Sequence, residues 1–411
     1  MSSEALALVN VEFVEKILKN SEGDQSIQVE DLKTEPVGGK NDNYGSEMIR
    51  ASVKYSRNKS GSKVMETISL ICKISLMTEG ATKELVKEFE SFKLEINMMQ
   101  RTLAQMNDVL NEKNDRLSPR LLYAEIGDPS FLVMEDLAPL GYRMANRLVG
   151  LDLEHSLLLM KNLAKFHASS VAVCEKDPKP KTLYNKSIFH ADRPESFKQF
   201  CVGGMRSLAK DLLNWSELGN DQHNYSEKLL KFSKVCYDKA VECVNLKQDE
   251  FHVINHGDCW VNNMLFRYDD EGKLTDHIFL DFQQPLWNSP AIDLVNIFTS
   301  SLADDVDLHH REDLLNEYLN MLTNTMSRLR CKTKPPTMEA LNKSLKDYEL
   351  YSVMATCLFL PIIRLDKSKL ANFNEMMQTD VFINPTYKEP SYRRIMLRRL
   401  PGWIARGLID T

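Results

Sequence analysis

The sequence has no long hydrophobic run and no leader-like start. Its most apolar later stretch, residues 353–363, is too short to cross a bilayer and contains Pro361. Near the N-terminus, Glu4, Glu12 and Glu15 interrupt the apolar residues, which is atypical of a signal peptide. We therefore expect a cytoplasmic protein with no membrane-spanning segment.

The sequence also lacks an excess of basic residues and any cysteine motif with regular spacing. The net charge of -6 argues against a general nucleic-acid-binding surface, which would be basic. The eight cysteines form no CxxC pair and no zinc-like cluster with histidine, so we read them as reduced thiols, mostly small core residues. With 43% hydrophobic and 27% charged residues, a chain of 411 residues can bury a large core and suits two lobes.

Hydrophobic spacing predicts the elements of the first third of the chain. Apolar residues at helical spacing over residues 6–18 predict an amphipathic helix. Alternation over residues 48–55 and 65–76 predicts two strands, and a second strand pair is expected at residues 121–123 and 131–134. Residues 82–106 form a strongly helical pattern between these pairs.

A turn-rich bend, residues 38–46, comes directly before the first of these predicted strands. Glycine there permits close backbone approach, so N–H groups of such a bend can lie over phosphates. The bend is not a GxGxxG pattern, and a plain hairpin turn is the alternative interpretation.

Lys73 is a lone charge in the apolar strand of residues 70–74. Lysine is seldom buried without a partner. Either Lys73 lies on an edge strand and reaches solvent, or it is the strand lysine that contacts the α- and β-phosphates of ATP and pairs with a helix glutamate. The helical pattern after it offers candidate partners: Glu84, Glu88, Glu90 and Glu95.

The most informative stretch is residues 256–263, followed by residues 278–283. Asp258 and Asn263 have the spacing of a kinase catalytic loop. Asp281 follows an apolar strand and precedes Phe282, and carboxylate and amide oxygens suit magnesium. An isolated HxD triplet is more often a loop aspartate that caps backbone. Four such residues in this order, ending with Asp293, instead favour phosphoryl transfer from ATP.

The strings NHGDCWVNNMLF and IFLDFQQPLWNSPAIDLVNIF resemble the ecdysteroid kinase-like family, also called CHK kinase-like. This family lies in the aminoglycoside/choline kinase branch of the protein-kinase-like fold. The resemblance extends from about Ile27 to the C-terminus. It implies an α+β, bilobal fold, with a small N-lobe of antiparallel sheet plus helix at residues 1–136. A large, mostly helical C-lobe at residues 137–411 would hold the catalytic loop and the acceptor pocket.

The resemblance also implies roles for particular residues. Asp258 would be the catalytic residue, and Asn263 and Asp281 would bind Mg2+. Lys73 would hold the phosphates of ATP opposite Glu95, with Glu88 as the alternative partner. The remaining implied contacts are Asn43 and Ser46 in the phosphate loop, the hinge backbone from Met134 to Leu137 (including Glu135) at the adenine, and Asp293 as a brace of the catalytic loop.

Some features depart from protein kinases. Gln283 replaces the glycine of DFG, and no APE-like segment precedes Asp293, so protein substrates are not expected.

His167 lies on the apolar face of a helix predicted over residues 151–173, where a satisfied core histidine is the favoured interpretation over a catalytic one. Further helices are expected over residues 194–214, 226–245, 312–330, 338–360 and 392–407.

We therefore expect an ATP- and Mg2+-dependent kinase that phosphorylates an alcohol group of a small molecule, an ecdysteroid or a similar lipophilic alcohol. One alternative is a choline, ethanolamine or aminoglycoside kinase, and another is an inactive nucleotide- or hormone-binding pseudokinase. The presence of Lys73, Asp258, Asn263 and Asp281 favours activity. No nucleic acid, membrane or obligate protein partner is expected beside the acceptor alcohol.

Overall fold

The computed structural model describes residues 3–38, 46–75, 87, 90–111, 116–365 and 385–410. The chain divides into two compact units, Met1–Arg143 with Leu265–Gln283, and Met144–Met264 with Gln284–Thr411. The first unit holds an antiparallel sheet with helices, and the second is mostly helical. The predicted α+β class is thus confirmed, while the lobe boundary expected between residues 136 and 137 stays a prediction.

The first unit is built on a five-stranded antiparallel sheet of order β1-β2-β3-β5-β4. Ile49, Ala51 and Val53 are buried along β2, because alternate side chains of a strand face the same side. The strands expected from this alternation are present. The five strands are β1 (Gln28–Pro36), β2 (Ser46–Lys59), β3 (Ser62–Ser75), β4 (Leu121–Glu125) and β5 (Phe131–Glu135).

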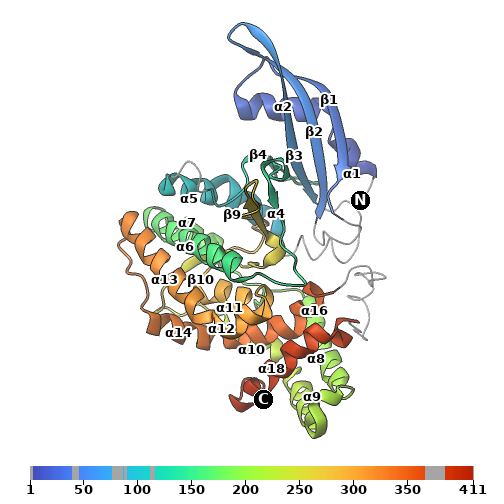
Figure 1. Cartoon of the computed structure of the whole chain (residues 1–411), viewed down its shortest axis with the longest axis vertical. Helices are drawn as coiled ribbons and strands as arrows, with labels where there is room; N and C mark the ends of the chain where they lie inside the picture. Colours follow the sequence, from blue (N-terminus) through green and yellow to red (C-terminus); the bar gives the residue numbers. More distant parts are fainter. Residues whose placement is uncertain are drawn as a thin grey trace. The chain divides into compact units, whose positions relative to one another are not determined.

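Two helices precede this sheet and pack into its core (Figure 1). They are α1 (Ser3–Leu8) and α2 (Val11–Glu22), so the single helix expected over residues 6–18 is divided. The division occurs because Asn10 caps α2, its side chain accepting a hydrogen bond from the Phe13 N–H at 3.0 Å.

The helix that follows the β2–β3 hairpin is described from Ser91 onward. It runs as α4 (Ser91–Asn97), a π-helical segment η1 (Met98–Thr102) and α5 (Leu103–Leu110). Glu84 and Glu88 of the predicted helix lie outside the described residues. A second sheet of three strands, ordered β6-β8-β9, is formed by β6 (Tyr142–Arg143), β8 (Met264–Tyr268) and β9 (Leu274–Phe279).

The second unit surrounds one helix that is buried along its whole length, α11 (Ala291–Ser300). Two long helices, α6 (Leu153–Lys176) and α13 (Arg311–Arg328), pack against each other. A short antiparallel pair is formed by β7 (Val253–Asn255), which precedes the loop of residues 256–263, and β10 (Leu286–Asn288).

The remaining helices of the second unit follow the expected pattern with two divisions. The helix predicted over residues 226–245 is two helices, and the one predicted over residues 338–360 is divided into three segments that end at Phe359, with a fourth beginning at Leu360. The remaining elements are α7 (Lys179–Leu183), α8 (Glu195–Leu212), η3 (Ser216–Asp221), α9 (Gln222–Phe232), α10 (Cys236–Cys243), η4 (Val261–Asn263), α12 (Asp304–His309), α14 (Met338–Asp347), α15 (Glu349–Met354), η5 (Ala355–Phe359), α16 (Leu360–Ile363), η7 (Pro385–Lys388) and α18 (Pro390–Ala405).

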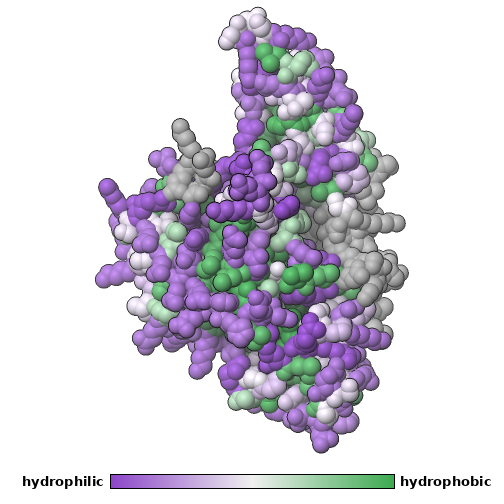
Figure 2. Space-filling model, viewed as in Figure 1, coloured by the Kyte–Doolittle hydropathy of each residue, from purple (hydrophilic) through white to green (hydrophobic). Residues whose placement is uncertain are grey.

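Within the described ranges, no helix is both long and apolar enough to cross a membrane. On the face seen in Figure 2, hydrophilic residues cover most of the described surface, with smaller apolar areas between them. All eight cysteines are free thiols, and only Cys243 and Cys331 are partly exposed. The expectation of mostly buried core cysteines is confirmed.

Candidate active site

In the first unit, a buried cation contacts two carboxylates. Lys73 lies on β3 and is 5% exposed. Its Nζ is 2.7 Å from Glu95 Oε2 and 2.6 Å from Asp281 Oδ1. Because β3 lies between β2 and β5, the edge-strand interpretation of Lys73 is wrong. The ion pair expected between Lys73 and Glu95 is present.

The pKa values of Glu95 and Lys73 are shifted by burial and by the charges that these residues and Asp281 place next to one another. Glu95, on α4, is 1% exposed. Burial raises the pKa of Glu95; the Lys73 charge opposes this shift and the Asp281 charge adds to it. Burial acts to lower the pKa of Lys73, but the charges of Asp281 and Glu95 outweigh it and raise that pKa above its usual value. The ammonium therefore stays charged.

Asp281 stands just after β9, in a backbone conformation that is uncommon for a residue other than glycine. Its φ is +64°, in the left-handed region, which aspartate tolerates better than most side chains. The side chain is 28% exposed, so it is partly open to solvent while it contacts Lys73. A carboxylate held this way can accept a further positive charge.

In the second unit, Asp258 and Asn263 contact each other directly. The side-chain nitrogen of Asn263 donates to the Asp258 main-chain oxygen at 2.9 Å and to its carboxylate at 2.8 Å. Asn263 is buried and Asp258 is half-buried. Because the amide nitrogen is used on Asp258, the amide oxygen of Asn263 is the atom that could bind a metal.

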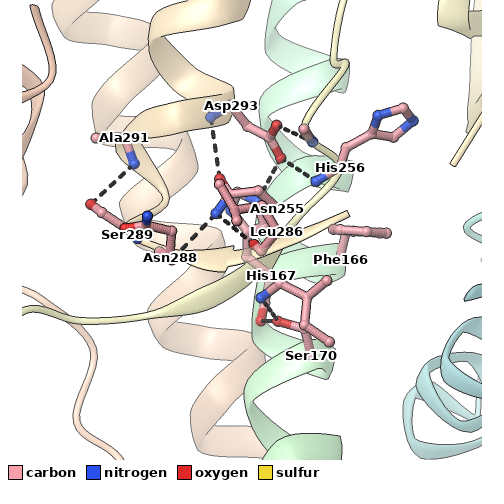
Figure 3. Close-up of polar contacts among 12 residues, drawn as sticks. Phe166, His167, Ser170, Asn255, His256, Leu286, Asn288, Ser289, Ala291 and Asp293 are labelled. Carbon is pink, nitrogen blue, oxygen red and sulfur yellow. Dashed lines mark hydrogen bonds and ion pairs between the residues drawn. The ribbon is translucent and has the colours of Figure 1, made fainter. Parts of the chain in front are cut away.

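Asp293 braces the loop that carries Asp258 (Figure 3). It lies in the first turn of α11 and is 0% exposed. One carboxylate oxygen accepts from the His256 N–H at 2.7 Å and the other from the Gly257 N–H at 2.9 Å. The Asp293 N–H donates to the Asn255 side chain at 3.2 Å. The brace implied by the resemblance is thus confirmed.

The loop is also held from within. The Nδ1 atom of His256 accepts from the Asp258 N–H at 3.3 Å, so this ring fixes the backbone at Asp258. Figure 3 shows the His256 side chain directed away from the Asp293 carboxylate. Cys259, beside Asp258, is fully buried, and burial raises the pKa of its thiol well above the usual value.

His167 is a satisfied core residue, as predicted. It is 0% exposed on α6, and both ring nitrogens have partners. Nδ1 lies 2.8 Å from the Tyr318 hydroxyl, and Nε2 lies 3.1 Å from Asp293 Oδ2. Sequence reasoning missed Tyr318, because a tyrosine in the apolar stripe of an amphipathic helix has the pattern of an ordinary core residue.

The expected hinge residues lie in a strand and a turn, and most of their backbone groups already form hydrogen bonds within the protein. The Glu135 N–H donates to the Arg120 carbonyl at 3.0 Å, and the Glu135 carboxylate contacts the Arg116 guanidinium. The Leu137 carbonyl accepts from the Leu140 N–H at 3.0 Å and from the Tyr142 N–H at 3.3 Å. In the described part of the chain, no partner is observed for the Leu137 N–H, which leaves one donor for a ligand.

The expected phosphate loop is only partly described. Asn43 lies outside the described residues, and Ser46 is buried at the start of β2, opposite Ser75. Over the described ranges, no cluster of three or more His, Cys, Asp or Glu side chains is placed to hold a metal. Magnesium commonly binds through one or two protein oxygens plus substrate phosphates. The Asp281 carboxylate in the first unit and the Asn263 amide oxygen in the second are each an oxygen donor of the kind this ion prefers.

Comparison with solved structures finds small-molecule phosphotransferases at low identity. An ethanolamine kinase from Plasmodium vivax is 12% identical, with TM-score 0.41, over 92% of this chain and 84% of that chain. A spectinomycin phosphotransferase in complex with ADP and spectinomycin is 12% identical, with TM-score 0.46, over 95% and 98%. An ADP-bound aminoglycoside phosphotransferase is 15% identical, with TM-score 0.33, over 84% and 99%.

Sequence comparisons give one decisive result. No curated protein matches the chain. The ecdysteroid kinase-like family matches residues 40–331, which is more than half of the sequence. The chain therefore belongs to the ecdysteroid kinase-like family.

Proposed function

We propose that the protein is an ATP- and Mg2+-dependent kinase that phosphorylates an alcohol group of a small lipophilic molecule, such as an ecdysteroid. The observation that carries this proposal is the double contact of the buried Lys73 ammonium with Glu95 and Asp281. One ammonium with two carboxylates leaves a net negative charge, which favours a divalent cation at the partly exposed Asp281. Membership of the family supports the reaction class.

In the first unit, Lys73 would contact the ATP phosphates, with Glu95 holding its ammonium in place. Asp281 would provide an oxygen ligand for Mg2+. When bound, the ion neutralises phosphate charge during transfer, which is the largest contribution expected in this type of reaction. Asn43 and Ser46 remain proposed phosphate contacts. The Leu137 N–H, two residues after Glu135, is the donor that we assign to adenine.

In the second unit, Asp258 would accept the proton of the acceptor hydroxyl or orient that hydroxyl toward the γ-phosphate. A positioned base contributes about 10²–10⁴ in rate. The Asn263 amide fixes the Asp258 carboxylate through the 2.8 Å hydrogen bond. The oxygen of the same side chain would be the metal ligand. Asp293 keeps the loop backbone in one conformation and would make no contact with the acceptor.

A magnesium-dependent phosphotransfer assay tests this proposal. The acceptor panel comprises ecdysteroids, other lipophilic alcohols, choline, ethanolamine and aminoglycosides. The wild type should transfer phosphate to at least one lipophilic alcohol, and Asp258→Asn should lose about 10²–10⁴ in rate. Asp305→Asn is the matched control, because Asp305 is an exposed aspartate on α12.

The outcomes separate the candidate functions. If phosphate is transferred only to choline or an aminoglycoside, the acceptor belongs to that class and not to the lipophilic alcohols. Equal inactivity of wild type and Asp258→Asn across the panel would contradict the enzyme proposal and favour a nucleotide- or hormone-binding protein. A thermal-shift screen of the same molecules, with and without Mg-ATP, identifies the acceptor independently of turnover.

A further inference from the structure

Two side chains beyond the proposed machinery extend the brace of the catalytic loop. The Tyr318 hydroxyl on α13 contacts the His167 ring on α6, and the ring contacts Asp293 on α11. All three side chains are 0% exposed. Asp293 in turn accepts from the N–H groups of His256 and Gly257. Three helices are thereby connected by hydrogen bonds to the two residues before Asp258.

The direction of each hydrogen bond follows from the chemistry of the groups. A carboxylate accepts, so His167 Nε2 carries a hydrogen and donates to Asp293. When Nε2 carries the only hydrogen of the ring, Nδ1 has a lone pair, which can accept from the Tyr318 hydroxyl 2.8 Å away. Burial raises the pKa of Tyr318 well above its usual value, with the Asp293 charge adding to the effect, so the hydroxyl keeps its proton. Tyr318 therefore selects the tautomer that Asp293 requires.

We propose that His167 and Tyr318 are positioning residues: they orient the Asp293 carboxylate, which holds the His256 and Gly257 amides and thereby presents Asp258 in one orientation. Their effect on rate rests on the proposed kinase function, whereas their effect on the loop does not. Without the hydrogen bond from His167, the Asp293 carboxylate would be held only by the loop amides that it binds. The carboxylate and the loop could then change orientation together.

The structural part is tested by hydrogen exchange of the full-length protein, without any ligand. In His167→Leu, the His256 and Gly257 amides should exchange at least about tenfold faster than in the wild type. His167→Gln is the conservative control, because its side-chain nitrogen lies about where Nε2 lies, and exchange should stay within about threefold. Unchanged exchange in His167→Leu would overturn the proposal, as would equal acceleration throughout the second unit.

The tautomer is read directly from imidazole nitrogen shifts in histidine-labelled protein. The wild type should show His167 as the neutral form with hydrogen on Nε2. A protonated ring or the opposite tautomer would overturn the assignment of Tyr318. Tyr318→Phe should give a mixed or shifted signal, and Tyr392→Phe should not. Tyr392 is a matched control, since it is equally buried and donates to the Thr356 carbonyl at 3.2 Å.

The catalytic part is a double-mutant cycle. Tyr318→Phe should lower kcat about fivefold to tenfold and change KM for ATP less than twofold, because it disturbs the base and not the nucleotide contacts. In a His167→Gln background, Tyr318→Phe should add almost nothing, since there is no tautomer to select. Full additivity would overturn the proposal. If exchange responds as expected but no variant or wild type transfers phosphate, the proposed function fails and the positioning role stands.

Discussion

The α-carbon of Gly257 lies so close to the main chain of Gln284 that a β-carbon on it would be 1.7 Å from the Gln284 carbonyl oxygen. The φ of Gly257 is +79°, a conformation that L side chains rarely adopt. Glycine is therefore required for two independent reasons at the residue directly before Asp258. Gln284 follows Asp281 by three positions in the sequence.

Gly257→Ala should lower the free energy of unfolding by at least about 2 kcal/mol, because the new methyl group meets rigid main chain. Urea unfolding measures the loss. Gly203→Ala on α8 is the control, since a β-carbon there meets nothing within 4 Å. That substitution should be neutral or stabilising by about 0.5–1 kcal/mol. A Gly257→Ala protein as stable as the wild type would contradict the close approach.

Removing Lys73 should be more damaging than removing the whole ion pair. Lys73→Met leaves Glu95 buried beside Asp281 without its cation, which should cost about 3–5 kcal/mol of stability. The double variant Lys73→Met/Glu95→Gln should recover part of that loss, because no uncompensated buried charge remains on α4. Denaturant titration of both variants checks this. Equal stabilities of the single and double variants would count against a strongly coupled pair.

Stability should depend on pH through Glu95. Its pKa is raised from 4.5 to about 7, mainly by burial. The folded state therefore binds the Glu95 proton more tightly than the unfolded state does. This proton's contribution to the unfolding free energy is fully present below pH 4.5 and is lost as the pH rises through about 7. The unfolding free energy of the wild type, minus that of Glu95→Gln, should therefore fall as the pH rises across this range. A difference that rises with pH would mean that Lys73 controls the carboxyl instead.

Thiol reagents should distinguish the cysteines by exposure. Cys331 is partly exposed and its pKa is raised to about 11, whereas burial raises the pKa of Cys259 much further. At neutral pH, Cys331 should react slowly and Cys259 should react only on unfolding, because the thiolate is the nucleophile. Mass spectrometry of the labelled protein identifies the site. Rapid labelling of Cys259 in the folded protein would show that the catalytic loop opens.

Magnesium should raise the melting temperature of the ADP-bound protein, and EDTA should reverse the effect. In Asp281→Asn the added stabilisation by magnesium should fall by at least about 1 kcal/mol, since a charged ligand is lost. Asparagine is the suitable replacement because it also tolerates the left-handed φ of +64°. ADP without metal should stabilise both proteins similarly. A magnesium response that survives in Asp281→Asn would place the ion elsewhere.

Parts of this arrangement could be predicted from the sequence, for a physical reason in each case. In β2, which pairs with the strand of Lys73, buried residues alternate with more exposed ones over residues 48–55, so its burial pattern is readable. A lone lysine in such a strand needs a partner, which directs attention to the glutamates of the following helix. The spacing of Asp258 and Asn263 indicates the loop. Their contact through the Asn263 amide is seen only in the structure.

Other parts could not be predicted, because the sequence signal is the same for different outcomes. A π-helical segment such as Met98–Thr102 shifts the hydrogen-bond register and leaves the apolar spacing almost unchanged. The division of the first helix depends on one side-chain cap at Asn10. Nothing in the spacing of Asp293 separates a brace from a metal ligand, and its connection to His167 and Tyr318 is seen only in the folded structure.

Helix α11 has no side that faces water, since each of its ten residues is buried. An ordinary surface helix presents a polar face, and its charges respond to dissolved ions within about 10 Å. Asp293 is shielded from that screening by its own helix. The support beneath the catalytic loop should consequently be indifferent to ionic strength, so any salt dependence of turnover would report on the ligands and not on the scaffold.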